Sequence, residues 1–149
     1  MGLLEGKVVL VTGGARGQGE AEGRRAVAEG ATVVVADVLD ELGERAAGEM
    51  GADYAHLDVT SVANWDAVVA DVVARHGHLD GLVHNAGILD FNKLVDDPVD
   101  AWERVIAVNQ TGVFLGMRAV AAHMVRQQAG SIVNISSVAH FDAVYAADA

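Results

Sequence analysis

Residues 7–19 read Lys-Val-Val-Leu-Val-Thr-Gly-Gly-Ala-Arg-Gly-Gln-Gly, and this stretch decides the fold. An apolar, β-branched run breaks directly into Gly13, Gly17 and Gly19, which is typical of a strand that leads into a phosphate-binding loop. Gly13 allows a sharp turn off the strand, Gly17 allows backbone to approach a pyrophosphate, and Gly19 allows the next helix to pack on the sheet. The free N–H groups and positive dipole end of that helix then bind phosphate.

A glycine-rich turn can also be no more than a turn, because glycine tolerates positive φ. A second β-branched run, residues 31–37, ends in Asp37, near the offset of about 20 residues at which a carboxylate reaches an adenosine ribose. Arg16 in the loop can meet either a pyrophosphate or a 2′-phosphate. Asp37 accepts hydrogen bonds from ribose hydroxyls but repels a 2′-phosphate, so the pattern predicts NAD rather than NADP as cofactor.

The composition is that of one globular domain spanning residues 1–149. It is 52% hydrophobic but only 5% aromatic, so we expect a core of Val, Ala, Leu and Ile. A formal net charge of −11 argues against nucleic acid or an anionic membrane as partner, and the absence of Cys excludes disulfides and thiolate chemistry. Because no signal-peptide pattern opens the chain and no apolar run approaches about 18 residues, we expect a cytoplasmic location.

Strand-like and helix-like segments alternate along the chain without a linker or a repeat. The predicted strands are residues 8–12, 32–37, 53–57, 79–85 and 130–136. The predicted helices are residues 18–29, 42–50, 62–76 and a tract from Asp97 as N-cap and Pro98 to about residue 128. Right-handed crossovers then give an α/β fold, a doubly wound parallel sheet of about five strands between two layers of helices.

Five short motifs follow one another in an order found in one enzyme family. They are Thr12-Gly-Gly-Ala-Arg-Gly-Gln-Gly19, Asp58-Val59, His84-Asn-Ala-Gly87, Asn109 and Asn134-Ile-Ser-Ser137. On these motifs, residues 6–137 resemble the short-chain dehydrogenases/reductases, whose single domain is Rossmann-like. The resemblance implies cofactor contacts from Gly13, Arg16, Gly17, Gln18, Gly19, Asp37, Asp58, Val59, Asn85, Ala86 and Gly87. Asp58 also has a simpler interpretation, as a residue near a helix start.

The resemblance further implies hydride transfer between NAD and a small-molecule secondary alcohol or ketone. In the family a tyrosine acts as acid and base, a serine holds the substrate oxygen and a lysine lowers the tyrosine pKa, because a phenol with a pKa of about 10 is a poor base at neutral pH. Ser137 matches that serine and Asn109 matches a structural and catalytic asparagine that interrupts a helical tract. Tyr145 is the candidate tyrosine.

The end of the chain departs from the family pattern. Tyr145 follows Ser137 at a shorter spacing, and Ala149 stands where the lysine belongs. His140 replaces a usual glycine, and Asp148 would raise the pKa of a neighbouring phenol. The catalytic site is therefore expected to be incomplete in this chain. The alternative function is an inactive dinucleotide-binding module or a self-associating fragment.

Two further expectations follow from the C-terminal shortening and from the histidines. Strand 130–136 would end the sheet as an open edge, and the apolar segment 113–125 would lack a covering helix, so we expect a homo-oligomer that buries this segment. His76 and His78 have no third ligand nearby in the sequence. We therefore expect exposed loop histidines there and no metal site.

Overall fold

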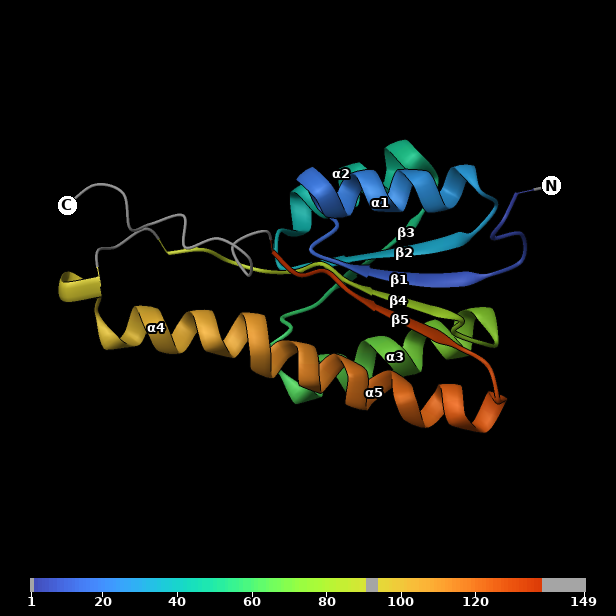
Figure 1. Cartoon of the computed structure of the whole chain (residues 1–149). Coiled ribbons are helices and arrows are strands. Elements are labelled where there is room, and N and C mark those ends of the chain that lie inside the picture. The colour runs from blue at the N-terminus through green and yellow to red at the C-terminus, as the bar shows by residue number, and fades with distance from the viewer. Residues whose placement is uncertain (1, 91–93, 138–149) are drawn as a thin grey trace.

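The computed structural model describes residues 2–90 and 94–137, which form a parallel sheet with helices on both faces (Figure 1). The strands are β1 Val8–Thr12, β2 Thr32–Asp37, β3 Asp53–His56, β4 Gly81–His84 and β5 Ser131–Asn134. Their order across the sheet is β3-β2-β1-β4-β5, so the direction of winding reverses between β1 and β4. The predicted doubly wound α/β fold is confirmed.

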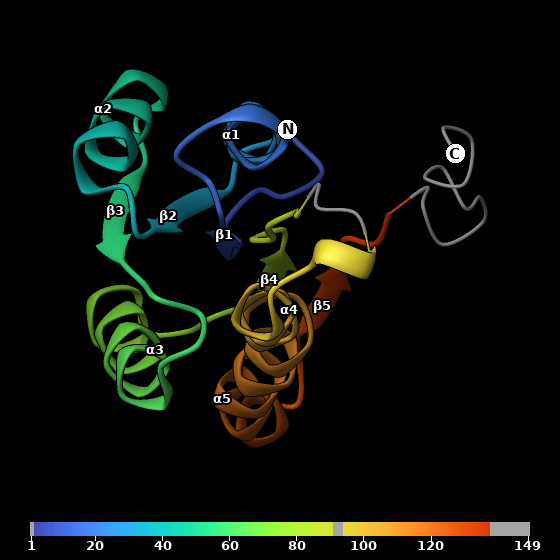
Figure 2. The same ribbon diagram turned by 90° about the vertical axis from the view of Figure 1, so that its left-hand side faces the viewer.

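The helices are divided between the two faces of the sheet (Figure 2). One face carries α1 Gly17–Ala28 and α2 Asp40–Met50, and the other carries α3 Val62–His76, α4 Val99–Ile106 and α5 Gly112–Gln127. A short 3₁₀ helix, η1 Leu94–Asp96, precedes α4. Figure 2 shows α1 and α2 above β1, β2 and β3, whereas no labelled helix lies above β4 and β5 on that face.

The central strands are buried on both faces, as expected for a parallel sheet between two helical layers. Leu10 and Val34 belong to the core beneath α3 and α5, and Val11 and Val35 belong to the core beneath α1 and α2; all four side chains are fully buried. Trp65 of α3 is the largest fully buried side chain, and its Nε1 donates to the carbonyl of Val59 at 2.9 Å. The core is therefore largely aliphatic, as expected, but it consists of Val, Ala and Leu with Trp65, Met50 and Met124, and among the described residues no Ile is fully buried.

The long helical tract differs from its prediction in two ways. It begins at Val99 with Pro98 in the cap position, so Asp97 is not the N-cap that the sequence indicated. It is also interrupted, because the π-helical turn η2 Ala107–Thr111 separates α4 from α5. Asn109 lies in the middle of this turn, at the point where the sequence predicts an interruption. Such π-turns recur at functional sites.

The tract Val99–Gln127 is also long enough to cross a membrane, and it contains an 18-residue window whose mean hydropathy of 1.3 is high enough. The sequence did not indicate this, because no continuous apolar run is present. Leu115, Val120 and Met124 of the tract are buried and belong to the core between the helix and the sheet. Length and composition alone do not distinguish a membrane span from such a core helix.

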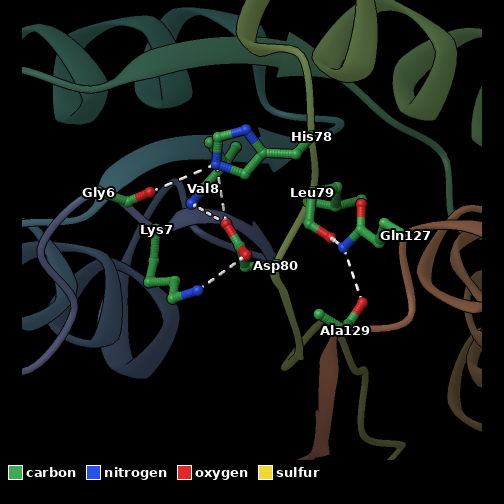
Figure 3. Close-up of polar contacts among 8 residues, drawn as sticks. All are labelled: Gly6, Lys7, Val8, His78, Leu79, Asp80, Gln127 and Ala129. Carbon is green, nitrogen blue, oxygen red and sulfur yellow. Dashed lines mark hydrogen bonds and ion pairs between the residues drawn. The ribbon is translucent and has the colours of Figure 1, made fainter.

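The amino ends of β1 and β4 are joined by a polar cluster around Asp80 (Figure 3). Its carboxylate accepts from the N–H of Val8 at 2.9 Å and lies 3.1 Å from both Lys7 Nζ and His78 Nε2. Partial burial by itself raises the pKa of Asp80, but the hydrogen bond from Val8 and the neighbouring Lys7 lower it below its usual value. The cluster is therefore structural, and it lies at the opposite end of the strands from the glycine loop.

A second contact in the same view connects α5 to the start of β4. Gln127 Nε2 donates to the carbonyl of Leu79 at 2.7 Å and to that of Ala129 at 2.8 Å (Figure 3). These bonds hold the turn between α5 and β5 against the sheet. The amide of Gln127 thus sets where the last strand begins.

The expectation of exposed loop histidines is wrong: His76 is the last residue of α3, His78 follows in the connection to β4, and both are partly buried. His76 Nε2 lies 3.0 Å from the carboxylate of Asp53, and His78 lies in the Asp80 cluster. Within residues 2–90 and 94–137, no group of three or more His, Asp or Glu side chains could hold a metal ion.

Candidate dinucleotide-binding site

A cavity of about 590 Å³ opens at the carboxyl ends of the strands, where the winding reverses between β1 and β4. Open α/β sheets bind their ligands at this reversal. Predicted cofactor residues that line it are Gly13, Arg16, Gly17, Asp37, Asp58, Val59, Asn85, Ala86 and Gly87. The sheet therefore gathers segments that lie far apart in the sequence around one hollow.

The loop after β1 carries two glycines with left-handed backbone, Gly13 with φ +64° and Gly17 with φ +61°. A Cβ on Gly17 would meet nothing within 4 Å, so open space lies in front of the α1 N-terminus. A Cβ on Gly19 would collide with the carbonyl of Gly13 and lie 2.5 Å from Asn85 Nδ2. Gly19 is therefore needed for contact between the loop and the β4 turn, a different reason from the helix-to-sheet packing that the sequence indicated.

Thr12 and Asn85 join the loop after β1 to the turn after β4. The fully buried Thr12 Oγ1 accepts from the N–H groups of Asn85 at 3.2 Å and Ala86 at 3.1 Å. In return, Asn85 Nδ2 donates to the carbonyls of Thr12 at 3.1 Å and Gly13 at 3.2 Å. Thr12 is not among the predicted site residues; the signal that could have found it is its position directly before the first glycine of the motif.

Asp37 is held in place at the end of β2. Its Oδ2 accepts from the N–H of Ala15 in the glycine loop at 3.0 Å, and its Oδ1 accepts from the N–H of Leu39 at 3.1 Å. The carboxylate is partly buried and lines the cavity. An ionised carboxylate has about four acceptor positions, so two remain for a ligand.

Asp58 lines the cavity from the loop between β3 and α3. Its Oδ1 accepts from the N–H and the hydroxyl of Thr60, at 2.9 Å and 2.7 Å. Ser61 is the N-cap of α3, and its Oγ accepts from the N–H of Asn64 at 3.2 Å. Asp58 therefore lies near a helix start, as its simpler interpretation has it, and it also lines the cavity; the N-cap itself is Ser61.

Asn109 connects the π-turn to the segment after β4. Its Oδ1 accepts from the N–H of Ile88 at 2.9 Å, and its Nδ2 donates to the carbonyl of Ile88 at 2.8 Å. Ile88 and Val108, the residue next to Asn109, both line the cavity. These two apolar residues, like Val38, Leu39 and Leu57, line the cavity but were not predicted, because isolated aliphatic residues carry no distinctive pattern.

The remaining predicted residues lie in different places. Arg16 lines the cavity and is exposed at the α1 N-cap, whereas the Gln18 side chain donates to Glu22 at 2.9 Å along the helix and does not line the cavity. Ser137 is exposed, just beyond β5. Tyr145 lies outside the described residues, as do His140, Asp148 and Ala149.

Comparison with known proteins identifies the family. The family model for short chain dehydrogenases matches residues 7–148. This chain belongs to the short-chain dehydrogenase family. A crystal structure of a short chain dehydrogenase from Mycobacterium smegmatis superposes with a TM-score of 0.89 at 35% identity, covering 95% of this chain and 62% of that one. The Rossmann-like fold of this short-chain dehydrogenase is therefore shown by both sequence and structure.

Two relatives show how much of a dehydrogenase the chain represents. The 3-alpha-(or 20-beta)-hydroxysteroid dehydrogenase of Mycobacterium tuberculosis is 51% identical over 139 residues, which are 92% of this chain and 54% of the relative. The cyclopentanol dehydrogenase of Comamonas sp. is 42% identical over 143 residues, which are 93% of this chain and 57% of the relative. This short-chain dehydrogenase sequence thus spans about half the length of these relatives.

Proposed function

We propose that the chain is the NAD-binding part of an oxidoreductase that transfers hydride between NAD(H) and a secondary alcohol or ketone. The observation that carries the proposal is the position of Asp37, which lines the cavity while hydrogen bonds from Ala15 and Leu39 hold its carboxylate. A dinucleotide supplies the hydride acceptor or donor. The chain supplies the binding surface and the orientation.

The residues of the cavity fit the parts of a nicotinamide dinucleotide. The open space before Gly17, the α1 N-terminus and the exposed Arg16 suit a pyrophosphate. The two remaining acceptor positions of Asp37 suit the hydroxyls of the adenosine ribose. Apolar Leu39 and Val59, which also line the cavity, suit the flat faces of a base.

Asp37 also supports NAD over NADP. Its carboxylate could turn away from a 2′-phosphate only by losing the bonds from Ala15 and Leu39. A 2′-phosphate would then lie against a fixed negative charge, a contact that costs several kcal/mol when it is desolvated. The second acidic side chain of the cavity, Asp58, adds to this repulsion.

The proposed substrate is a small molecule with a secondary hydroxyl on a ring, because the named relatives act on hydroxysteroids and on cyclopentanol. In this proposal Ser137 holds the substrate oxygen and Tyr145 exchanges the proton. Because Ala149 stands where the family has its lysine, the chain alone should lose the roughly 10²- to 10⁴-fold contributed by acid–base catalysis. An NAD-binding chain without turnover is therefore the alternative function.

The other parts of the proposal concern location and partners. A net charge of −11 disfavours nucleic acid and anionic membranes as partners. We place the protein in the cytoplasm as a homo-oligomer, with a small molecule as its substrate.

Titration with NADH and NADPH tests the proposal. We expect the wild-type chain to bind NADH at least about tenfold more tightly than NADPH, since each 1.4 kcal/mol of repulsion corresponds to one factor of ten. Asp37→Asn should reduce this preference because the repelling charge is lost. Asp66→Asn on the exposed surface of α3 changes the net charge equally and should leave the preference intact. Equal affinity of the wild-type chain for the two dinucleotides would overturn the NAD assignment.

A further inference from the structure

His84, the last residue of β4, is the one histidine that is fully buried within residues 2–90 and 94–137, with 2% of its surface exposed. Its Nε2 lies 3.1 Å from the carbonyl of Gly112, and its ring packs against Trp65 with the centroids 5.5 Å apart. A carbonyl only accepts hydrogen bonds, so Nε2 carries the proton. Burial lowers the pKa of His84, which favours this neutral form.

The helix approaches β4 closely at this point because it carries glycines there. Gly112 is the first residue of α5, directly after the π-turn. A Cβ on Gly116, one turn further on, would lie 2.6 Å from His84 Nε2 and 2.6 Å from the Trp65 ring. The imidazole thus fills the space between helix and strand, and its size sets how closely they approach.

Two polar contacts connect the helical tract around the π-turn to β4 and the residues that follow it. His84 binds the carbonyl of Gly112 just after the π-turn, and Asn109 within the turn binds both backbone groups of Ile88. Asn85 and Ala86 lie between these two contacts in the sequence, and Thr12 of β1 accepts hydrogen bonds from their N–H groups. A shift of the helix at Gly112 would consequently move Asn109 relative to Ile88.

We infer that His84 is a positioning residue for Asn109, and through it for the wall of the cavity formed by Ile88 and Val108. The inference rests on the proposed NAD site. With the adenosine ribose at Asp37 on β2 and the pyrophosphate at α1 after β1, the second nucleotide extends toward β4, where this wall lies. His84 is buried beneath the wall, so it acts through Asn109.

This chain differs here from the family pattern, in which the position of His84 is the first asparagine of the N-N-A-G turn. The imidazole Nε2 lies farther from the backbone than an asparagine amide does, so His84 reaches a helix carbonyl across the core. Glutamine is the closest substitute, because its amide extends to a similar distance and can donate. Phenylalanine retains a ring but has no donor.

The experiment compares the affinities for NADH and for AMP, which contains only the adenosine end of the dinucleotide. His84→Phe should weaken NADH binding about tenfold and change AMP binding less than twofold. His84→Gln should restore most of the loss. Asn109→Ala should weaken NADH in the same selective way, and the double variant should be no weaker than the weaker single variant. His123→Phe on the same helix is the matched control and should leave both affinities unchanged.

Each outcome has a distinct meaning. Equal weakening of NADH and AMP in His84→Phe, or no weakening of either, would overturn the positioning role. If His84→Phe does not fold, His84→Gln and the ¹⁵N chemical shifts of the wild-type imidazole decide: NADH must shift the Nε2 resonance more than AMP does. A wild-type chain that binds neither nucleotide would instead overturn the proposed function itself.

Discussion

The β2 side and the β5 side of the sheet are made of similar strands but are covered differently. Register places Val35 of β2, Val11 of β1, Val83 of β4 and Val133 of β5 in one row on the same face. Val35 and Val11 are fully buried, Val83 is partly buried and Val133 is 48% exposed. Exposure increases along the row because α1 and α2 cover only the β1–β3 part of this face (Figure 2).

The difference separates the proposed cofactor site from the proposed catalytic serine. The cavity is lined mainly by the segments that follow β1, β2, β3 and β4, and the central strands β1 and β2 lie in a core that covers both faces. Ser137 follows β5, whose residues are mostly exposed. A second hollow of about 280 Å³, lined in part by Val9, Gly81 and Ser131, lies at the amino end of this poorly covered side. The proposed cofactor site thus lies beside strands that are buried on both faces, whereas the proposed catalytic serine follows a strand that is mostly exposed.

The largest expected effect on stability comes from replacing valine by alanine at one end of the valine row, and the same replacement at the other end is its control. Val35→Ala should lower the free energy of unfolding by about 2 kcal/mol, because it leaves a cavity in a packed core. Val133→Ala should lower it by less than about 0.5 kcal/mol, because the side chain is half exposed. Urea denaturation measures both values, and equal losses would mean that the β5 face is covered in solution.

A second prediction asks whether another copy of the chain covers exposed apolar surface. Trp102 of α4 and Phe114 of α5 are 60% and 58% exposed. If a homodimer buries them, Trp102→Glu should weaken association about tenfold or more. Moderate salt should strengthen wild-type association by screening the net charge of −11. Val62→Glu, which places the same charge on α3, should have little effect.

Sedimentation velocity measures this association. A wild-type chain that stays monomeric at micromolar concentrations, at both low and moderate salt, would contradict the predicted homo-oligomer. This prediction concerns exposed side chains of α4 and α5, whereas the valine row faces α1 and α2 on the other side of the sheet. The two tests are therefore independent.

The smallest predicted effect is a pH dependence from His84, which lies between the covered and uncovered sides. Burial lowers its folded pKa below the unfolded value of about 6.5, so the stability of the neutral form is present above that pH and is lost as the pH falls through it. One such group changes stability by at most about 1.4 kcal/mol per pH unit. His84→Gln should therefore flatten the stability profile between about pH 7 and pH 5.

Asp80 provides the contrast for this measurement. Its folded pKa is lowered, so its contribution is present above the unfolded carboxyl value of about 3.9 and is lost only as the pH falls below it. Asp80→Asn should consequently change the profile near pH 4 and below. If the wild type and His84→Gln show the same dependence of stability on pH between pH 7 and pH 5, that result would argue against burial of a neutral imidazole.

Several elements were predictable because their signals are local. The bounds of β1, β2 and α3 agree with the prediction, since β-branched runs define the strands and Ser61 and Gly77 mark the helix ends. The π-turn was not predictable as such. Its conformation accompanies the contact of Asn109 with the backbone of Ile88, which lies in a distant part of the sequence.

The sequence by itself determined the alternation of strands and helices, the glycine loop and the acidic residue that follows β2, because hydrophobic periodicity and glycine spacing act over short stretches of chain. Only the tertiary structure decided which donors hold Asp37, how Thr12 joins two loops, why Gly19 has no room for a side chain and where His84 lies. Each of these depends on groups far apart in the sequence. Strand pairing across β2, β1 and β4 brings them within hydrogen-bonding distance, and no local pattern encodes that pairing.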